Sequence, residues 1–275
     1  MAANITIETL PARPVVSLKR ILLPAEHGAW GMLAEPIVAG LAIAFSPSAP
    51  WIALFIAAAF MARQPMKVLF AGLKAKTRWA DHHRTALQYL LIFGSLALIA
   101  FAAFLFTSDT AALAPFAIAA PLVIYQFYFD ITRRGRRLLP EIAGAAAISS
   151  SIAAMALAAG MGWALAAALW ITFIFRLVPS IMYVRNRLRL EKGKPASIVE
   201  PIAAHFVALG GVGMLAAAGV GSYLTVAVFT LLMIRAAVGL SPMRRRVKAT
   251  KIGIMEVVYG IVVAAAIITG YYLQI

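Results

Sequence analysis

The chain alternates between long apolar segments and short polar connectors over nearly its whole length. A helix needs roughly 20 mainly apolar residues to cross the ~30 Å hydrocarbon core of a membrane. The pattern predicts an all-α integral membrane protein that forms a single transmembrane domain over residues 1–275. We expect about nine transmembrane helices, near residues 28–45, 51–70, 86–106, 111–129, 139–159, 163–183, 196–218, 223–238 and 253–273.

The connectors between these segments form two sets that alternate along the chain. One set, like the C-terminal tail, contains no lysine or arginine and comprises residues 46–50, 107–110, 160–162 and 219–222. The other set is strongly basic and comprises residues 74–84, 133–137, 185–194 and 244–251. Basic residues concentrate in cytoplasmic loops. The alternation therefore predicts a multi-pass protein of the cell (inner) membrane with a cytoplasmic N-terminal segment, residues 1–20, and an external C-terminus.

Composition excludes several classes of protein. Hydrophobic residues make up 63% and charged residues 13% of the chain, with a mean hydropathy of +0.90, so a soluble enzyme is excluded. The net charge of +15 falls in the basic connectors, which argues against nucleic-acid binding and for topology signals or contacts with anionic lipid headgroups. The absence of cysteine excludes disulfides and thiolate metal sites. Residues 1–20 lack the apolar core and cleavage site of a signal peptide.

Ionisable residues also occur inside the predicted spans, nearly all in the half nearest the basic connectors. Because such residues are costly in a membrane, they are candidates for function. Spans running towards the basic side carry Arg63, Lys67, Arg176 and Arg235, and the returning spans carry Glu26, His27, Glu35, Glu141, Glu200, His205 and Glu256. This one-sided pattern predicts a polar cavity that faces the cytoplasm and is closed above by apolar side chains. The alternative is that these arginines snorkel to the interface or fasten neighbouring helices.

The most distinctive string is PAEHGAWGMLAEP at residues 24–36. Glu26 beside His27 is suited to proton exchange, because histidine titrates near neutral pH. The alternative is a polar helix start anchored at the interface by Trp30. The string resembles the signature of the YwiC-like family of bacterial membrane proteins, and the resemblance is expected to extend over the whole chain. It implies a family without implying an activity.

The nine spans and the large basic loops after spans 2 and 6 are similar, more distantly, to the UbiA prenyltransferase superfamily. Residues 193–197 (GKPAS) and 139–141 (LPE) also resemble stretches of those enzymes. The resemblance implies a UbiA-like helical bundle with two Asp-rich motifs that hold Mg²⁺ against a prenyl diphosphate. The corresponding stretches here, 60–67 (FMARQPMK) and 176–187 (RLVPSIMYVRNR), contain no Asp or Glu. Since Asp81 alone does not replace two carboxylate clusters, we expect no Mg²⁺ and no other cofactor.

Cations occupy the positions where carboxylates would be. Arginine binds phosphate or carboxylate with two parallel hydrogen bonds and needs no metal. The predicted ligand-binding residues are Arg63, Gln64, Lys67, Arg176, Ser180, Tyr183 and Arg187. The predicted acid–base candidates are Glu26, His27, Glu35, Glu200 and His205.

Three functional hypotheses remain open at this stage. The first is a cavity that binds an amphipathic anion or an isoprenoid or quinone-type lipid, with membrane lipids as the partners. Any enzyme activity would be that of a divergent UbiA-like intramembrane transferase. The second is a small-anion or proton-coupled transporter, and the third is a membrane subunit with no small-molecule site.

Overall fold

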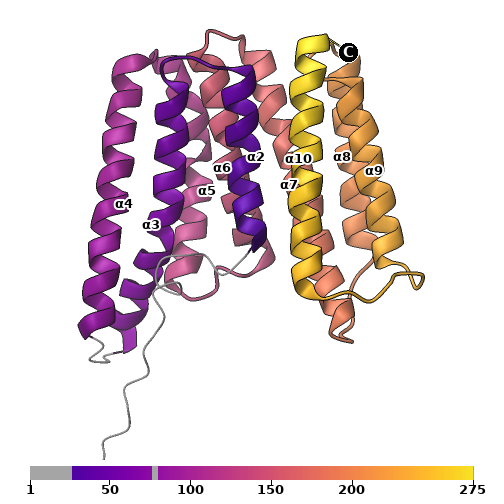
Figure 1. The fold of residues 1–275 in the computed structure, drawn as a ribbon, viewed down its shortest axis with the longest axis horizontal. Helices are drawn as coiled ribbons and strands as arrows, with labels where there is room; N and C mark the ends of the chain where they lie inside the picture. Colours follow the sequence, from indigo (N-terminus) through magenta and orange to yellow (C-terminus); the bar gives the residue numbers. More distant parts are fainter. Residues whose placement is uncertain (1–26, 76–79, 275) are drawn as a thin grey trace, which may run out of the picture.

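The computed structural model describes residues 27–75 and 80–274, and all the regular structure in this part of the chain is helical. Within the described residues, nine α-helices run up and down in one bundle, with one short 3₁₀ turn before α5 (Figure 1). Their bounds are α2 His27–Ile43, α3 Ala49–Ala75, α4 Ala80–Thr107, η1 Thr110–Leu113, α5 Ala114–Ile131, α6 Leu138–Ala158, α7 Trp163–Glu191, α8 Val199–Ala217, α9 Tyr223–Leu240 and α10 Ala249–Leu273.

The helices confirm the all-α membrane fold predicted from the sequence. Eight of the described helices are long and apolar enough to cross a membrane, and α2 is a shorter apolar helix of 17 residues. Each predicted span coincides with one of these nine helices. The largest difference lies in α7, which runs to Glu191 although its apolar segment ends near Tyr183. The chain is therefore embedded in a membrane through these apolar helices.

The described connectors lie at two opposite ends of the bundle (Figure 1). The connectors 132–137, 192–198 and 241–248 lie at one end, here called the basic end. The connectors that lack lysine and arginine lie at the opposite end, together with the end of α10. The charge segregation in the sequence therefore corresponds to two physically separate faces.

Three helices stop in the same way, with a glycine whose backbone is left-handed. Gly160, Gly193 and Gly219 have φ of 77°, 65° and 71° and follow α6, α7 and α8. In each case the next amide donates to a carbonyl five residues back, as Met161 does to Ala156 at 2.9 Å. Glycine adopts this conformation without steric cost, so these positions end the helices and turn the chain.

Helix α6 lies at the centre of the bundle and α4 at its edge. Of the residues in the apolar segment of α6, 78% are buried inside the protein, whereas only 11% are buried in the apolar segment of α4. Small side chains fill α6, and they let α2, α3, α5 and α7 pack closely around it. At one such crossing, a Cβ added to Gly40 of α2 would lie 2.4 Å from the Met155 sulfur. The exposed apolar side chains of α4, such as Leu98 and Phe106, are available to contact lipid.

The arrangement predicts that the two ends of the bundle face different compartments. Single cysteines placed at Lys192 and at Gln274 should react with membrane-impermeant reagents from opposite sides, because an odd number of spans separates the basic end from the end of α10. The natural chain has no cysteine, so the labelling has no background. Labelling of both positions from the same side of sealed vesicles would contradict this topology.

Candidate functional site

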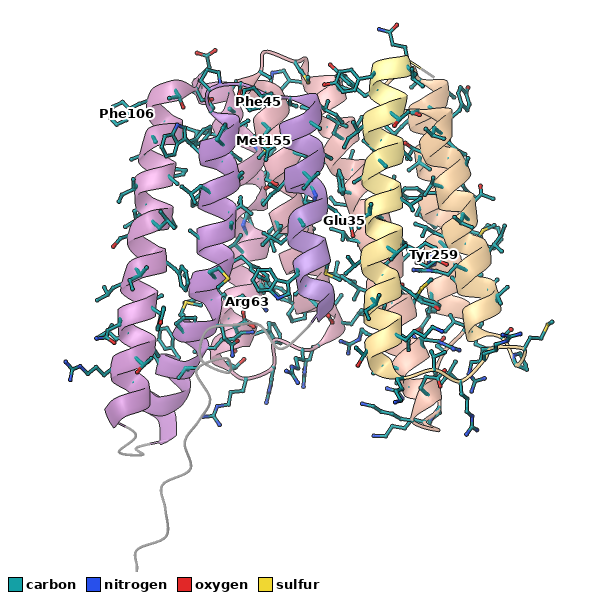
Figure 2. The ribbon with its side chains drawn as sticks, in the orientation of Figure 1. Glu35, Phe45, Arg63, Phe106, Met155 and Tyr259 are labelled. Atoms are coloured by element: carbon teal, nitrogen blue, oxygen red, sulfur yellow. The ribbon has the colours of Figure 1, made fainter. Side chains whose placement is uncertain are left out.

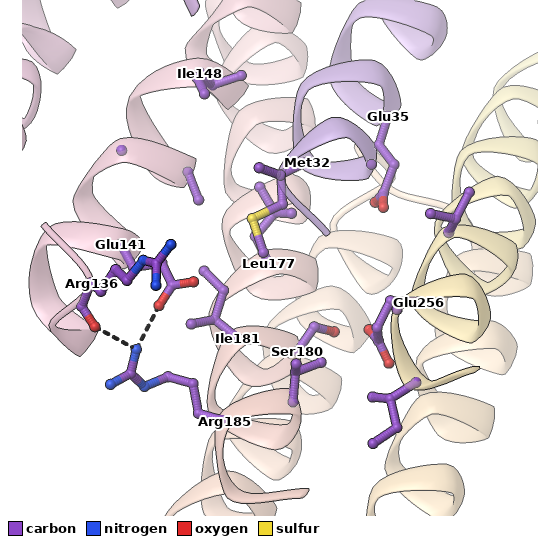
Figure 3. A pocket seen from close by; sticks show the side chains of 18 of the residues that line it. Met32, Glu35, Arg136, Glu141, Ile148, Leu177, Ser180, Ile181, Arg185 and Glu256 are labelled. Atoms are coloured by element: carbon purple, nitrogen blue, oxygen red, sulfur yellow. Dashed lines mark hydrogen bonds and ion pairs between the residues drawn. The ribbon is translucent and has the colours of Figure 1, made fainter. Parts of the chain in front are cut away.

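A pocket of about 510 Å³ lies in the basic half of the bundle (Figure 3). Its walls come from α2, α3, α5, α6, α7 and α10 and from the connector between α5 and α6. Apolar side chains form part of its lining, among them Phe60, Ile148 and Leu177. Five basic and three acidic residues also line it: Arg63, Lys67, Arg136, Arg176, Arg185, Glu35, Glu141 and Glu256. The pocket therefore combines an apolar surface with an excess of positive charge.

Four buried charged side chains from four helices form a continuous series of ion pairs beside this pocket, here called the Arg–Glu chain. Arg176 of α7 is central, with Nε 3.3 Å from Oε2 of Glu35 on α2. Its Nη1 lies 3.7 Å from Oε2 of Glu256 on α10. The other oxygen of Glu256 accepts a hydrogen bond from Nη1 of Arg235 on α9. Two arginines and two glutamates thus balance one another.

The surroundings of Arg176 hold its guanidinium in place. Its Nη1 donates to the Ser180 hydroxyl one turn along α7, and its Nη2 donates to the Glu256 backbone carbonyl at 3.3 Å. Gly260 of α10 leaves space for the Glu35 carboxylate, since a Cβ added to Gly260 would lie 2.0 Å from Oε1 of Glu35. Glu35 lies about midway along the bundle, whereas Arg63 lies nearer the basic end (Figure 2).

Arg235 is buried between two aromatic rings. Its guanidinium carbon lies 4.1 Å from the ring centre of Tyr183 and 5.0 Å from that of Tyr259. Such cation–π contacts favour a charged group that has lost its water. Gly239 makes room for the Tyr183 hydroxyl, because a Cβ there would lie 2.4 Å from it. Tyr183, a predicted ligand contact, therefore packs against Arg235 and does not line the pocket.

A second buried cluster surrounds Asp130, at the end of α5. Arg63 binds its carboxylate with two hydrogen bonds, Nε to Oδ2 at 2.5 Å and Nη2 to Oδ1 at 3.0 Å. The ammonium nitrogen Nζ of Lys67 lies 3.0 Å from Oδ1 of Asp130. With its amide oxygen facing Arg63, Gln126 accepts from Nη2 at 2.7 Å. Gly135 packs directly on the carboxylate, since a Cβ there would lie 1.9 Å from Oδ1.

Sequence reasoning missed Asp130, although a signal for it existed. Asp130 is the acidic residue at the end of the fourth span, and Gln126 precedes it by one helical turn. Its position just before the basic run 133–137 makes it look like part of the connector. Its side chain is in fact 1% exposed, whereas those of Arg63 and Lys67 are 26% and 30% exposed.

The structure brings together only part of the predicted ligand-binding set. Arg63, Lys67, Arg176 and Ser180 line the pocket, but Gln64 does not. Arg187 is occupied elsewhere, because it donates to the carbonyl of Gly239 at 2.6 Å and to that of Arg245 at 2.5 Å. It also pairs with Glu191 at 2.9 Å. These bonds attach the end of α7 to the connector between α9 and α10.

The predicted acid–base candidates are more widely dispersed. Glu35 lines the pocket, whereas Glu200 is exposed at the start of α8. His205 is buried on α8 with its Nδ1 2.7 Å from the Pro201 carbonyl, and it does not line the pocket. Glu26 and the side chain of His27 lie outside the described residues.

The residues at the site do not fit a Mg²⁺–diphosphate centre. Mg²⁺ requires oxygen ligands in near-octahedral geometry. The side chains that face the pocket from 60–67 and 176–187 include Arg63, Lys67 and Arg176, which repel a cation. Both carboxylates near Arg176 are already paired with guanidinium groups. Among the residues that the structure describes, no three His, Asp or Glu side chains are grouped to hold a metal, and the side chain of Asp81 lies outside them.

The Asp130 cluster predicts a stability effect. Replacing Asp130 by Asn removes the carboxylate that Arg63 and Lys67 share and should lower the free energy of unfolding by about 1–3 kcal/mol. Thermal unfolding in mild detergent measures the change. Asp109→Asn, which makes the same substitution in an exposed position, is the control. Equal unfolding midpoints for the two variants would show that the cluster adds nothing to stability.

Comparison with known proteins finds a likeness to one family and gives no activity. No curated protein and no solved structure matches the chain, so the likeness to the UbiA superfamily remains a prediction. The sequence model described as "YwiC-like protein" matches residues 23–157. The match contains the string at residues 24–36 and ends within α6. Over residues 23–157, just under half of its length, the chain is therefore similar to the YwiC-like protein family.

Proposed function

We propose that the pocket binds an amphipathic anion of the isoprenoid or quinone-type lipid class at the cytoplasmic face of the inner membrane. The observation that carries this proposal is the lining of the pocket, in which an excess of cations surrounds an apolar interior. A ligand that is charged at one end and apolar over the rest would match both surfaces.

The cations of the pocket are suited to binding the charged head. Arg63 and Lys67 approach it from α3, and Arg176 with Ser180 approaches it from α7. A guanidinium in this setting binds phosphate or carboxylate without a metal. The apolar part of the ligand would lie against Phe60, Ile148 and Leu177 and bury their surface.

Any proton transfer in this pocket would fall to Glu35. It is the one residue of the predicted acid–base set that lines the pocket among the described side chains. Its carboxylate lies beside Arg176, where the head of the ligand is proposed to bind. Proton transfer requires the acid or base within hydrogen-bond reach of the reacting group, a condition that this position can meet.

A small-anion or proton-coupled transporter is the second candidate, favoured by a second pocket at the opposite end of the bundle. That pocket, of about 760 Å³, lies between α7, α8, α9 and α10, and none of its lining residues is charged. Thr172 lines it, and Arg176, one helical turn further along α7, lines the first pocket. Along α10 the two pockets are separated by residues 258–266, which include the fully buried Val263. A carrier would have to open this apolar barrier.

The binding proposal predicts that Arg176→Lys weakens the thermal stabilisation of the protein by geranyl phosphate. Lysine keeps the positive charge but lacks the planar guanidinium group that donates two parallel hydrogen bonds. The loss of a charge-assisted hydrogen bond should weaken binding roughly ten- to a hundredfold, about 1.5–3 kcal/mol. Arg189→Lys is the matched control, because it makes the same change in an exposed position of the same helix. Geraniol, which lacks the charge, should stabilise neither protein.

Two results would contradict the proposal. Equal stabilisation of the Arg176→Lys and Arg189→Lys proteins would remove Arg176 from the site. Uptake of inorganic phosphate into proteoliposomes, without any stabilisation by geranyl phosphate, would favour the transporter.

The pocket also predicts that binding is independent of Mg²⁺, because cations stand where the metal-binding carboxylates of a prenyltransferase would be. Stabilisation by geranyl phosphate should be unchanged when EDTA is added. If EDTA abolished this stabilisation and Mg²⁺ alone restored it, the proposal that the site binds its ligand without a metal would be wrong.

A further inference from the structure

The Arg–Glu chain carries no net positive charge that could compensate an additional anion. The formal charges of its four residues sum to zero. The exposed fractions of the side chains are 7% for Glu35, 2% for Arg176, 11% for Glu256 and 7% for Arg235. An anion that binds to Arg176 would leave this buried group with one negative charge in excess. Uncompensated charge in a membrane interior is costly. The charge must therefore be balanced when the anion binds.

The two glutamates are not equally replaceable. Glu256 pairs with both Arg176 and Arg235, so it keeps a partner when Arg176 binds something else. Among the described residues, the ion pairs of Glu35 are made with Arg176 alone, through Nε at 3.3 Å and Nη2 at 3.4 Å. Its remaining surroundings include Gly31 and Gly260. Glu35 is thus the carboxylate that a competing anion would displace.

The pocket lies on the route by which such an anion would arrive. Glu35, Arg176 and Ser180 all line it, and Ser180 accepts a hydrogen bond from Nη1 of Arg176. Figure 3 shows Glu35 and Glu256 on the side of the pocket opposite Glu141 and Arg185. An anion from the pocket can therefore meet Arg176 on its Ser180 side.

We propose that an anion bound to Arg176 displaces Glu35 and that the freed Glu35 carboxylate takes up one proton. This inference rests on the proposed function, because it concerns the same anion site. The proton comes from water and forms an O–H bond on the carboxylate, so the anion and the proton enter together. The total charge of the buried group then stays at zero.

Outside the Arg–Glu chain, the charged groups around Glu35 have pairing partners of their own. From α7 and α10 it faces Arg176 and Glu256, and Glu256 in turn holds Arg235 of α9. From α3, Arg63 and Lys67 line the same pocket but pair with Asp130, and from α6 Glu141 pairs with Arg185 at 2.7 Å. Among the described side chains packed around α2, Glu35 is therefore the carboxylate that loses its partner.

The proposal predicts that anion binding depends on pH with a slope of one proton. Decanesulfonate is a suitable probe, because its own charge does not change between roughly pH 5 and 9. In the pH range where Glu35 is ionised before binding and protonated in the complex, the association constant of decanesulfonate should fall about tenfold for each unit of rising pH. Calorimetry with the full chain in phosphatidylcholine nanodiscs, corrected with empty nanodiscs, measures this constant.

Two variants locate the proton. Glu35→Gln is permanently neutral, so it should bind decanesulfonate at least as tightly as the natural protein does at low pH, and without a slope. Glu200→Gln, in an exposed position at the start of α8, should keep the slope of the natural protein. If Glu35→Gln does not fold, calorimetry of the natural protein in two buffers of different ionisation enthalpy should still count one proton taken up.

The outcomes separate this inference from the proposed function. Binding with no pH slope and no proton uptake would overturn the inference and leave the anion site intact. A slope that persists in Glu35→Gln would also overturn it, because the proton would then bind elsewhere. Absence of decanesulfonate binding at every pH, in a protein that is folded, would overturn both.

Discussion

The pairing of Arg176 with Glu35 and Glu256 is the interaction on which the rest of the site depends. A charged side chain inside a membrane protein needs a partner, and removal of one partner leaves an uncompensated buried charge. Because these residues come from α7, α2 and α10, the requirement fixes how the three helices lie along one another. Arg235 extends the requirement to α9. The same pairing that fastens the bundle also forms one wall of the pocket.

The rest of the bundle separates polarity along its length. Small side chains of α6 provide a close-packed centre, and the described connectors without basic residues lie at the opposite end. At the basic end, Asp130 gathers Arg63 and Lys67 into a second cluster that faces the same pocket. The lining of this pocket therefore combines charged residues of both clusters with apolar side chains such as Phe60, Ile148 and Leu177. That division of chemistry is the physical basis for the proposed amphipathic ligand.

Local features of the sequence were sufficient to predict the spans. The length and hydropathy of a span are set by the membrane itself, so each apolar segment indicates its own helix. Tertiary pairings have no such local signature, and for this reason the bonds from Arg63 to Asp130 and from Arg187 to the connector after α9 were not foreseen. The sequence predicted Tyr183 as a ligand-binding residue, but contact with Arg235 decides its environment.

The central claim is that the charged pocket binds a specific amphipathic anion and does more than fasten helices. The most direct test is mass spectrometry of the lipids that remain bound when the protein is purified gently from its own membrane. The account predicts that one anionic or isoprenoid lipid is enriched relative to the bulk membrane, at about one molecule per chain. A bound lipid composition identical to that of the bulk membrane would contradict it.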